Sequence, residues 1–390
     1  GIIKFHMKKK IFLFLLAGFV AYLIFLSFKI KNFYQKVYTP QKKVEKKDKF
    51  NFLLFGYGGS NHQGAFLTDT IMVLHLNTKD KKAVLISIPR DLWVSIPTKS
   101  GEKFGLKINT IYTSELFPEN YPDVDKKYFG SKDDASFFKM IVGRVINQKI
   151  DYYAGIDFEG FKKAIDALGG VEVNVEKSFV DFEYPIEGKE NDLCGQEEVF
   201  KKAEKFLNNS ASPDDFKQLE EDQILNQFVK NATTTSYLAF PCRYQKVEFK
   251  KGPTLMNGDL ALKFVRSRHS TDDGSDFSRA RRQQLFLEAV KNKIISFNMI
   301  TKIFTLLDRL GDHFRTDVDL SLIKELLKEG KDADKYELIT YVLTTDNLLE
   351  ASLSESGQYI LIPKKGENDF SEIWEKINEL ENFQSSGRRE

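Results

Sequence analysis

Two short segments in the second half of the chain combine several arginines with a nearby carboxylate. Residues 265–269 read VRSRH and contain Arg266 and Arg268, and residues 276–284 read DFSRARRQQ. The planar guanidinium group of arginine binds a phosphate through two parallel hydrogen bonds, so closely spaced arginines favour a phosphorylated ligand. Arg266 and Arg268 alternate, and they would share one face if this segment were extended.

The second segment is predicted to begin a helix at Asp276. Arg279, Arg282 and Gln283 then lie on one side of that helix, because residues three or four positions apart are neighbours on a helix surface. The first turn of a helix carries free backbone N–H groups and favours an anion. An exposed basic helix face, or a contact with nucleic acid, would show the same run of arginines.

Two matching segments occur in the first half of the chain, at the ends of two predicted strands. Residues 67–70 read LTDT at the entry to one strand, and residues 87–91 read SIPRD at the exit of the next. The polar residues between these strands predict a hairpin, which would bring Asp69 close to Arg90 and Asp91. Mg2+ is often held by one or two carboxylates together with substrate phosphates, so the segments indicate a polyphosphate site with a metal ion. Taken alone, each pair is commonly a helix cap or a surface ion pair.

The elements needed to position these segments follow from the pattern of apolar residues. Short apolar runs bounded by turn residues predict strands, and apolar residues at helical spacing predict helices. A strand, a helix and a further strand follow one another over residues 152–175, as is typical of a layered α/β fold. The predicted strands are 52–56, 70–76, 83–88, 152–156, 171–175, 336–343 and 359–362, and the predicted helices are 158–168, 276–295 and 370–380.

Residues 187–243 differ in composition from the flanking sequence and are interpreted as a surface insertion with a little helix of its own. Both cysteines of the chain, Cys194 and Cys242, lie in this insertion. Neither belongs to a CxxC pair, which argues against a zinc or thioredoxin-like site. They could form one disulfide in an oxidising compartment, but their spacing in the sequence does not show whether they are close in space.

Residues 11–28 form an uncharged apolar run of about the minimum length for a membrane-spanning helix. We predict a transmembrane signal anchor there, after a short cytoplasmic N-terminus at residues 1–10 and before a basic linker at residues 29–49. Lysines are more frequent after this run than before it, which by itself would place the following domain in the cytoplasm. The 390 residues carry a formal net charge of only +2, so composition gives no general case for a nucleic-acid-binding protein.

The order and wording of these segments resemble those of the LytR–CpsA–Psr (LCP) family. The similarity covers NFLLFGYGG, LTDTIMVLHLN, VLISIPRDLWVSIP, KIN, DYYAGIDFEGFKKAIDALGGVEVNV, MNGDLALKFVRSRH and DFSRARRQQLFL. Several ordered motifs are together far more specific than any one of them. The resemblance implies a three-layer α/β/α domain with a central mixed sheet at residues 50–384, followed by a flexible tail at residues 385–390. It also places this large domain outside the cytoplasmic membrane, on the single anchor.

An activity is implied as well. Family members bind polyprenyl pyrophosphates with the lipid in an apolar tunnel, and an Mg2+-dependent reaction transfers the attached glycan to peptidoglycan or to a protein. Carried over to this chain, Asp69 would bind Mg2+ and Asp91 would accept the proton of the acceptor hydroxyl, with Asp276 as the alternative base. Arg90, Arg266 and Arg268 are expected to act in catalysis. The residues expected at the pyrophosphate are Arg90, Arg266, Arg268, Arg279, Arg282 and Gln283, with Lys107 and Asn109 at the edge of the pocket.

Two positions depart from the family pattern. Gly58 stands where members usually have an aspartate that binds the metal, and Leu67 stands where they commonly have an arginine. The GYGGSNHQG loop would then supply backbone amides or the side chain of His62 instead. The missing carboxylate at Gly58 leaves a second interpretation open, a non-catalytic polyprenyl-phosphate-binding protein or regulator of the envelope. A third interpretation, a cytoplasmic regulator or nucleic-acid binder, rests on the lysines after the anchor and on the RARRQQ sequence.

Overall fold

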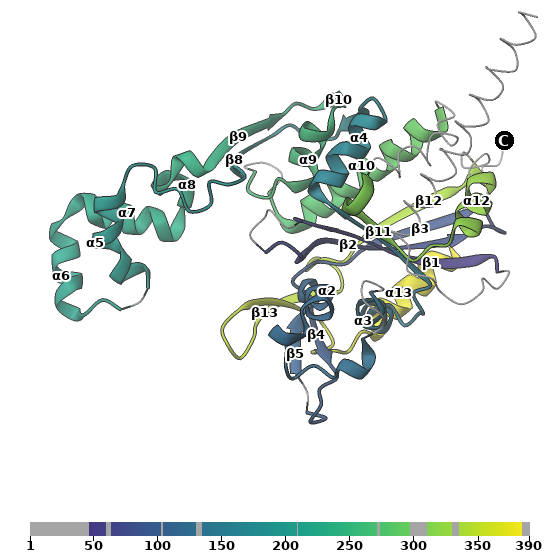
Figure 1. Ribbon diagram of the computed structural model, residues 1–390, viewed down its shortest axis with the longest axis horizontal. Coiled ribbons are helices and arrows are strands. Elements are labelled where there is room, and N and C mark those ends of the chain that lie inside the picture. The colour runs from purple at the N-terminus through teal and green to yellow at the C-terminus, as the bar shows by residue number, and fades with distance from the viewer. Residues whose placement is uncertain are drawn as a thin grey trace, which may run out of the picture.

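A six-stranded sheet forms the centre of the molecule in the computed structural model (Figure 1). The structure describes residues 47–383 apart from 60–63, 103, 130–134, 209, 271–273, 297–309 and 330–334. The strand order is β11-β6-β1-β2-β3-β12. These strands are β11 (Phe314–Thr316), β6 (Tyr152–Asp157), β1 (Lys49–Tyr57), β2 (Thr68–Asn77), β3 (Lys82–Ser87) and β12 (Glu337–Val342).

The pairing of these strands confirms the predicted α/β fold with a central mixed sheet. β1 is antiparallel to β2, β2 to β3 and β6 to β11, whereas β6 is parallel to β1 and β12 is parallel to β3. The hairpin predicted from the sequence is confirmed, since β2 and β3 pair from Met72↔Ser87 to Asn77↔Lys82. Asp69 at the start of β2 and Arg90 just after β3 are therefore brought to the same end of the two paired strands.

Helices cover both faces of the sheet, with α4, α9 and α10 on one side and α2, α3 and α13 on the other (Figure 1). The alternation of side chains along β1 shows why both layers are needed. Leu53 and Phe55 pack in the same core as Phe138 of α3 and Ile373 of α13, whereas Leu54 points to the opposite face. These helices are α2 (Ile111–Leu116), α3 (Ser136–Ile146), α4 (Phe158–Ala167), α9 (Gly258–Arg266), α10 (Asp276–Ser296) and α13 (Ser371–Asn382).

β7 (Val171–Val175) pairs with β10 (Gly252–Met256) and not with the central sheet. The strand–helix–strand order predicted for residues 152–175 is confirmed, but its second strand does not return to the sheet that holds the first. The three valines of β7 are buried, whereas Glu172 and Asn174 between them are exposed. A strand with one apolar face suits a ribbon packed on a helix, here α10, better than a strand covered on both faces.

Residues 187–243 form a small helical unit that projects from the body on two strands (Figure 1). β8 (Phe179–Pro185) leads out to the unit, and β9 (Tyr244–Phe249) leads back from it. The unit has a core of its own, in which the rings of Phe228 and Phe240 meet edge to face with centroids 5.4 Å apart. The insertion therefore contains more helix than expected, namely α5 (Glu197–Leu207), α6 (Pro213–Glu221), α7 (Gln223–Thr234) and α8 (Ser236–Ala239).

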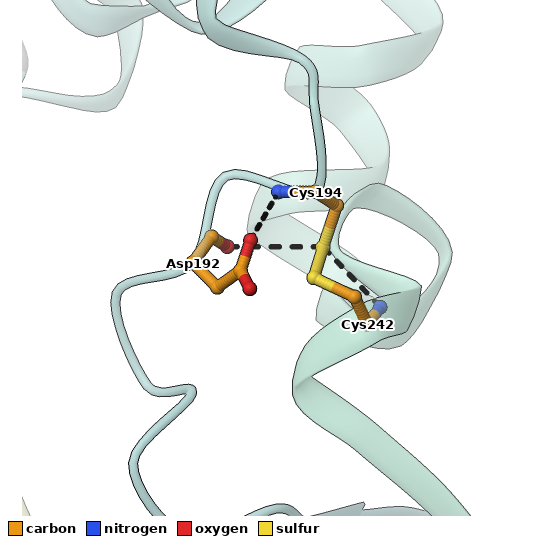
Figure 2. A group of neighbouring side chains, drawn as sticks. All are labelled: Asp192, Cys194 and Cys242. Atoms are coloured by element: carbon orange, nitrogen blue, oxygen red, sulfur yellow. Dashed lines mark hydrogen bonds between the residues drawn. A yellow bond between two sulfur atoms is a disulfide. The ribbon is translucent and has the colours of Figure 1, made fainter.

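A disulfide joins Cys194 to Cys242 and settles the pairing that the sequence left open (Figure 2). Asp192 approaches the same place, and its Oδ1 accepts a hydrogen bond from the backbone N–H of Cys194 over 2.8 Å. Within the described ranges these three residues are the only group of three potential metal-ligand side chains within reach of one ion. Because the disulfide uses both thiols, this group is not a metal site.

The predicted signal anchor at residues 11–28, with most of the sequence around it, lies outside the described residues, and so does the predicted tail at residues 385–390. Across the described part of the chain, no helix has both the length and the apolar character needed to cross a membrane. The elements of the domain predicted for residues 50–384 begin with β1 at Lys49 and end with α13 at Asn382.

A buried ion pair fastens α3 to the edge of the sheet. The ammonium group of Lys139 on α3 bonds to the carboxylate of Asp317, which follows β11 and is fully buried. The same carboxylate accepts a hydrogen bond from the backbone N–H of Tyr153 in β6 over 2.7 Å. This carboxylate therefore joins the helical layer to two strands at once.

Replacing Lys139 by methionine is expected to lower the free energy of unfolding by roughly 3–5 kcal/mol, because the buried carboxylate of Asp317 then loses the ammonium group of Lys139. Urea unfolding followed by circular dichroism measures the loss. Lys365→Met is the matched control, since Lys365 lies 3.9 Å from Glu372 in a half-exposed pair that contributes less than about 1 kcal/mol. Equal losses in both variants would contradict the role given to the Lys139 pair.

Candidate active site

An apolar cavity lies between the central sheet and the helices α4 and α10. Its volume is about 460 Å3. Met72 of β2, Phe161 of α4, Phe286 of α10 and Phe314 of β11 are among the residues that line it. A cavity of this size, walled largely by aliphatic and aromatic groups, suits an apolar ligand or the apolar part of a larger one.

A cluster of arginines and aspartates adjoins the cavity, and Asp69, Arg90, Arg268 and Arg279 of this cluster belong to the cavity lining. Asp69 in β2 accepts a hydrogen bond from Nη1 of Arg90 over 2.6 Å, across the end of the β2–β3 hairpin. Asp276 begins α10, and its Oδ1 lies 3.3 Å from Nε of Arg268. Nη2 of Arg279, one turn further along α10, donates to Oδ2 of Asp276 over 3.0 Å and to the backbone oxygen of Asp69 over 2.9 Å. Three arginines thus meet two carboxylates, which leaves the cluster positively charged.

The pKa values in this cluster reflect burial and the charges of neighbouring side chains. Burial alone would raise the pKa of Asp69, but the positive charges of Arg279, Arg90 and Arg268 outweigh burial and hold that pKa below its ordinary value. Burial lowers the pKa of Arg279 to about 10. Burial, together with the charge of Arg90, also lowers the pKa of Arg268. An anionic ligand would stabilise the charged form of these arginines, because it offsets both effects.

Several polar atoms of the cluster are buried without a hydrogen-bond partner. Among the described residues, Nε of Arg90, Nε of Arg279 and Oδ1 of Asp276 make no hydrogen bond. A buried donor that lacks a partner costs free energy, so such atoms call for an explanation. The oxygens of a bound pyrophosphate would supply acceptors for both Nε atoms.

Arg266 reaches the cavity from the end of a helix. It is the last residue of α9, because the apolar residues before it recur at helical spacing behind the Asn257 cap. The extended conformation considered for VRSRH is therefore wrong at this position. The guanidinium carbon of Arg266 lies 4.0 Å from the centre of the Phe158 ring, and its Nη1 donates to the hydroxyl of Tyr184 over 3.3 Å. These contacts hold Arg266 in the lining of the cavity.

Asp181, which the sequence did not single out, fixes the position of Arg268. Oδ2 of this fully buried carboxylate accepts hydrogen bonds from Oγ of Ser267 over 2.6 Å and from the backbone N–H of Arg268 over 3.1 Å. The position of Asp181 within a strand could have indicated that its side chain is buried. Asp181 occupies an inward position of β8, two residues after the buried Phe179, and a carboxylate buried there needs several partners.

α10 buries Arg279, Arg282 and Gln283 on its inner side, as their spacing predicted, but the three side chains have different neighbours. Gln283 lines the cavity and donates to the backbone oxygen of Val265 over 3.1 Å. Arg282 is not part of the lining, and its Nε donates to the backbone oxygen of Phe264 over 3.1 Å. The structure does not bring Arg282 to the cluster, and places it where it ties α10 to the end of α9.

Asp91 lies at the outer flank of the cluster, outside the cavity lining. Its Oδ1 accepts a hydrogen bond from Nζ of Lys107 over 2.7 Å, and its Oδ2 lies 3.6 Å from Nε of Arg90. Asn109 is buried nearby, and its backbone oxygen accepts a hydrogen bond from the hydroxyl of Thr68 over 3.3 Å. The structure thus brings Asp91 and Lys107 together beside the cluster, whereas Asn109 supports the backbone at the start of β2.

Two carboxylates of the cluster are placed where a metal ion could use them. Arg90 bonds to Oδ1 of Asp69, and Oδ2 receives no hydrogen bond from a described residue. Asp276 adds its Oδ1, which makes no hydrogen bond but lies in ion pairs with Arg268 and Arg279. Mg2+ usually keeps several waters and takes one or two carboxylates plus substrate phosphates, so this donor set fits Mg2+ bound together with a phosphorylated ligand. Gly58 brings no carboxylate, and His62 lies outside the described residues.

Known proteins with similar sequences include two transferases. The polyisoprenyl-teichoic acid–peptidoglycan teichoic acid transferase TagU of Oceanobacillus iheyensis is 26% identical over 286 residues, 73% of this chain and 63% of that protein. The protein of the same name from Halalkalibacterium halodurans is 26% identical over 328 residues, 81% of this chain and 80% of that protein. The first match thus spans less than two thirds of the relative's length. Both relatives are named as transferases, that is, as enzymes.

A solved structure and a family model agree with these relatives. The crystal structure of B. subtilis TagV matches with a TM-score of 0.54 at 21% identity, covering 87% of this chain and 100% of that one, which shows a shared fold. The model of the LytR_cpsA_psr family matches residues 22–369, a range that contains all four arginine- and aspartate-bearing segments. The resemblance inferred from the motifs is therefore confirmed, and this chain belongs to the LytR–CpsA–Psr family.

Proposed function

We propose that this chain is a transferase that moves a glycan phosphate from a polyprenyl-pyrophosphate-linked carrier to a hydroxyl group of the cell envelope, on peptidoglycan or on a protein. One observation supports this most strongly: the lining of an apolar cavity includes Arg90 and Arg279, whose buried Nε atoms make no hydrogen bond. Such a site matches a ligand that joins a long hydrocarbon chain to adjacent phosphates. The names of the curated relatives, which are teichoic acid transferases, support the same class of reaction.

The carrier would bind with its hydrocarbon chain in the apolar cavity and with its phosphates at the arginines. Its hydrocarbon chain lies in the cavity against Phe161, Phe286 and Phe314, where burial of apolar surface favours binding. Its phosphates lie against Arg90, Arg268 and Arg279, and they supply acceptors for the Nε atoms of Arg90 and Arg279, which make no hydrogen bond in the free protein. The position of the pyrophosphate is fixed from both sides, which satisfies the main requirement of phosphoryl transfer.

The reaction forms one phosphorus–oxygen bond and breaks another. The oxygen of the acceptor hydroxyl attacks the phosphorus that carries the glycan, the bond from that phosphorus to the bridging oxygen breaks, and polyprenyl phosphate leaves with the bonding electrons. Asp91 takes the hydroxyl proton, because it flanks the cluster on the side away from the cavity. Asp276 is the alternative base, but its contacts with Arg268 and Arg279 make it a counter-ion within the cluster.

Charge neutralisation accounts for much of the catalysis in this kind of transfer. Arg90, Arg266 and Arg268 stand where charge gathers on the phosphoryl oxygens. Asp69 would hold Mg2+ together with phosphate oxygens, and Asp276 is near enough to the same oxygens to assist. The bound ion would neutralise charge on the leaving phosphate and would orient the two phosphates relative to each other.

We place the domain outside the cytoplasmic membrane, on one membrane-spanning segment at residues 11–28. The disulfide between Cys194 and Cys242 supports this side, because disulfides persist in oxidising compartments and are rare in the cytosol. The lysines that follow residues 11–28 would favour the opposite side. The disulfide is the stronger argument, since it belongs to the folded domain itself.

Gly58 favours a second candidate function, a protein that binds the polyprenyl-pyrophosphate carrier without turnover. Both candidates need the cavity and the arginines, but only the transferase releases polyprenyl phosphate. The full chain in detergent, incubated with a lipid-linked donor, purified peptidoglycan and Mg2+, separates the two. Release coupled to labelling of the acceptor supports the transferase, whereas tight binding with no release across several acceptors supports the binding protein.

Arg268→Ala is expected to lower the rate of polyprenyl phosphate release about 100-fold or more, because charge on the phosphoryl oxygens loses one of its donors. Arg281→Ala is the matched control. Arg281 lies on α10 between two of the buried residues of the site, but its side chain is exposed and paired with Glu176 on the surface. A rate that falls equally in both variants, or in neither, would argue against the role of Arg268.

Asp69→Asn is expected to change pyrophosphate binding in opposite directions with and without Mg2+. Without Mg2+, inorganic pyrophosphate should bind more tightly to the variant, because a negative charge has been removed from the cluster. With Mg2+, the concentration of the ion needed for half-maximal binding should rise at least about tenfold, because its carboxylate ligand is lost. Isothermal titration calorimetry measures both effects. Unchanged Mg2+ dependence in the variant would exclude Asp69 as a ligand.

Ala154→Phe is expected to separate lipid binding from phosphate binding. Ala154 lines the apolar cavity from β6, and a phenyl ring at this position occupies space that the hydrocarbon chain needs. Affinity for polyprenyl pyrophosphate should fall about tenfold or more, while affinity for inorganic pyrophosphate should stay within about twofold. The free energy of unfolding serves as the control for correct folding. Undiminished lipid affinity in a folded variant would show that the chain binds elsewhere.

A further inference from the structure

A hairpin of two strands lies against the flank of the cluster that carries Asp91. It consists of β13 (Leu349–Leu353) and β14 (Tyr359–Pro363). The backbone N–H of Leu361 in β14 donates to the backbone oxygen of Asp91 over 2.9 Å, and Leu361 forms a parallel bridge with Leu92. β13 lies on the side of the central sheet away from α4, α9 and α10 (Figure 1). The hairpin and the apolar cavity therefore adjoin the cluster from opposite sides.

Two large apolar side chains of this hairpin face solvent next to each other. Tyr359 and Leu353 are paired across the two strands, and they are 51% and 67% exposed. Burial raises the pKa of Tyr359, and the negative charges of Asp91 and Asp276 raise it further, so this ring lies within electrostatic reach of both carboxylates. This aromatic ring is half-exposed beside a candidate base, so its free face is available to a ligand that approaches Asp91.

The hairpin is separate from the space assigned to the carrier. None of its residues lines the apolar cavity, which extends from the cluster toward α4 and α10. An acceptor hydroxyl that gives its proton to Asp91 must approach from the flank that the carrier leaves open. Lys107 borders that flank on one side and the hairpin borders it on the other.

We propose that the β13–β14 hairpin binds the acceptor, and that this acceptor is a saccharide chain with one sugar ring stacked on Tyr359. A sugar ring has a face of C–H groups and a rim of hydroxyls, so it fits a half-exposed aromatic ring that has polar groups around it. The turn of the hairpin supplies such groups, since Ser354, Ser356 and Gln358 cluster there through their hydrogen bonds. The inference rests on the proposed function, and it selects a glycan acceptor over a protein acceptor.

The kinetic test uses the full chain in detergent with a lipid-linked donor and graded concentrations of a soluble peptidoglycan strand. Tyr359→Ala is expected to raise the KM for the strand about tenfold while the KM for the donor stays the same. Tyr359→Trp should restore the KM for the strand, because it keeps a ring that can stack. Phe216→Ala is the matched control, since Phe216 is an equally exposed aromatic residue, 52% exposed, and its helix α6 belongs to the helical unit that projects from the body (Figure 1).

A second measurement needs no turnover and keeps this inference distinct from the proposed function. Purified peptidoglycan sacculi are sedimented with each variant in the absence of donor, and the bound fraction is measured. Binding that Tyr359→Ala removes and Tyr359→Trp keeps supports the hairpin site, even if no variant releases polyprenyl phosphate and the transferase is abandoned. Equal sedimentation and an equal KM for the strand in wild type and Tyr359→Ala would overturn the inference. Transfer to a protein but to no saccharide would overturn it as well.

Discussion

Burial of Arg279, together with the repulsion between it and two neighbouring arginines, is the constraint around which this site is built. Arg279 is 4% exposed, and Arg90 and Arg268 lie beside it around the same two carboxylates. In a region of low dielectric such repulsion is costly, and the cost falls only where counter-charges are held close. Asp69 and Asp276 supply part of the balance, and a phosphorylated ligand completes it. The fold must therefore bring together four separate segments of the chain, which carry these arginines and aspartates, at one end of the strands β2 and β3.

Each segment is held by an interaction that does not involve the ligand. The β2–β3 pairing places Asp69 next to Arg90, and the buried carboxylate of Asp181 accepts a hydrogen bond from the backbone N–H of Arg268. Arg282 binds carbonyl oxygens at the end of α9 and so fixes the first turns of α10. These supports orient the phosphate-binding groups before the ligand arrives, which lowers the cost of organising charge during a reaction. The neighbouring cavity adds the apolar surface that makes the site suitable for an amphiphile.

Much of this arrangement was visible in the sequence, because it rests on local patterns. Alternating apolar residues and a polar turn predicted the β2–β3 hairpin, and with it the contact between Asp69 and Arg90. Helical spacing predicted that Arg279 and Gln283 would share one side of α10, and in the structure both are buried. The sequence could not show that β7 leaves the central sheet, since its pairing with β10 depends on residues about eighty positions away. Such pairing is decided by the packing of the whole chain.

Other features depend on the orientation of a side chain and on how deeply it is buried, and the spacing of residues in the sequence shows neither. Arg282 was grouped with Arg279 because both lie on one side of the helix, yet its guanidinium turns to the backbone of α9. Asp181 went unnoticed because a single aspartate in a strand usually faces water, whereas here it is fully buried among donors. Tyr359 likewise resembles any aromatic residue at the start of a strand. Its nearness to Asp91 follows from the place where β14 meets the segment after β3.

The helical unit at residues 187–243 is connected to the body through the paired strands β8 and β9. The pairing of β8 and β9 reaches Pro185↔Tyr244, and the disulfide closes the loop beyond that point, so both ends of the unit are fixed next to each other. Its core shares no residue with the core around the central sheet. Changes inside the unit therefore need no matching change near the arginines. In the course of descent such a module can be lengthened, exchanged or lost while the chemistry of the body is kept.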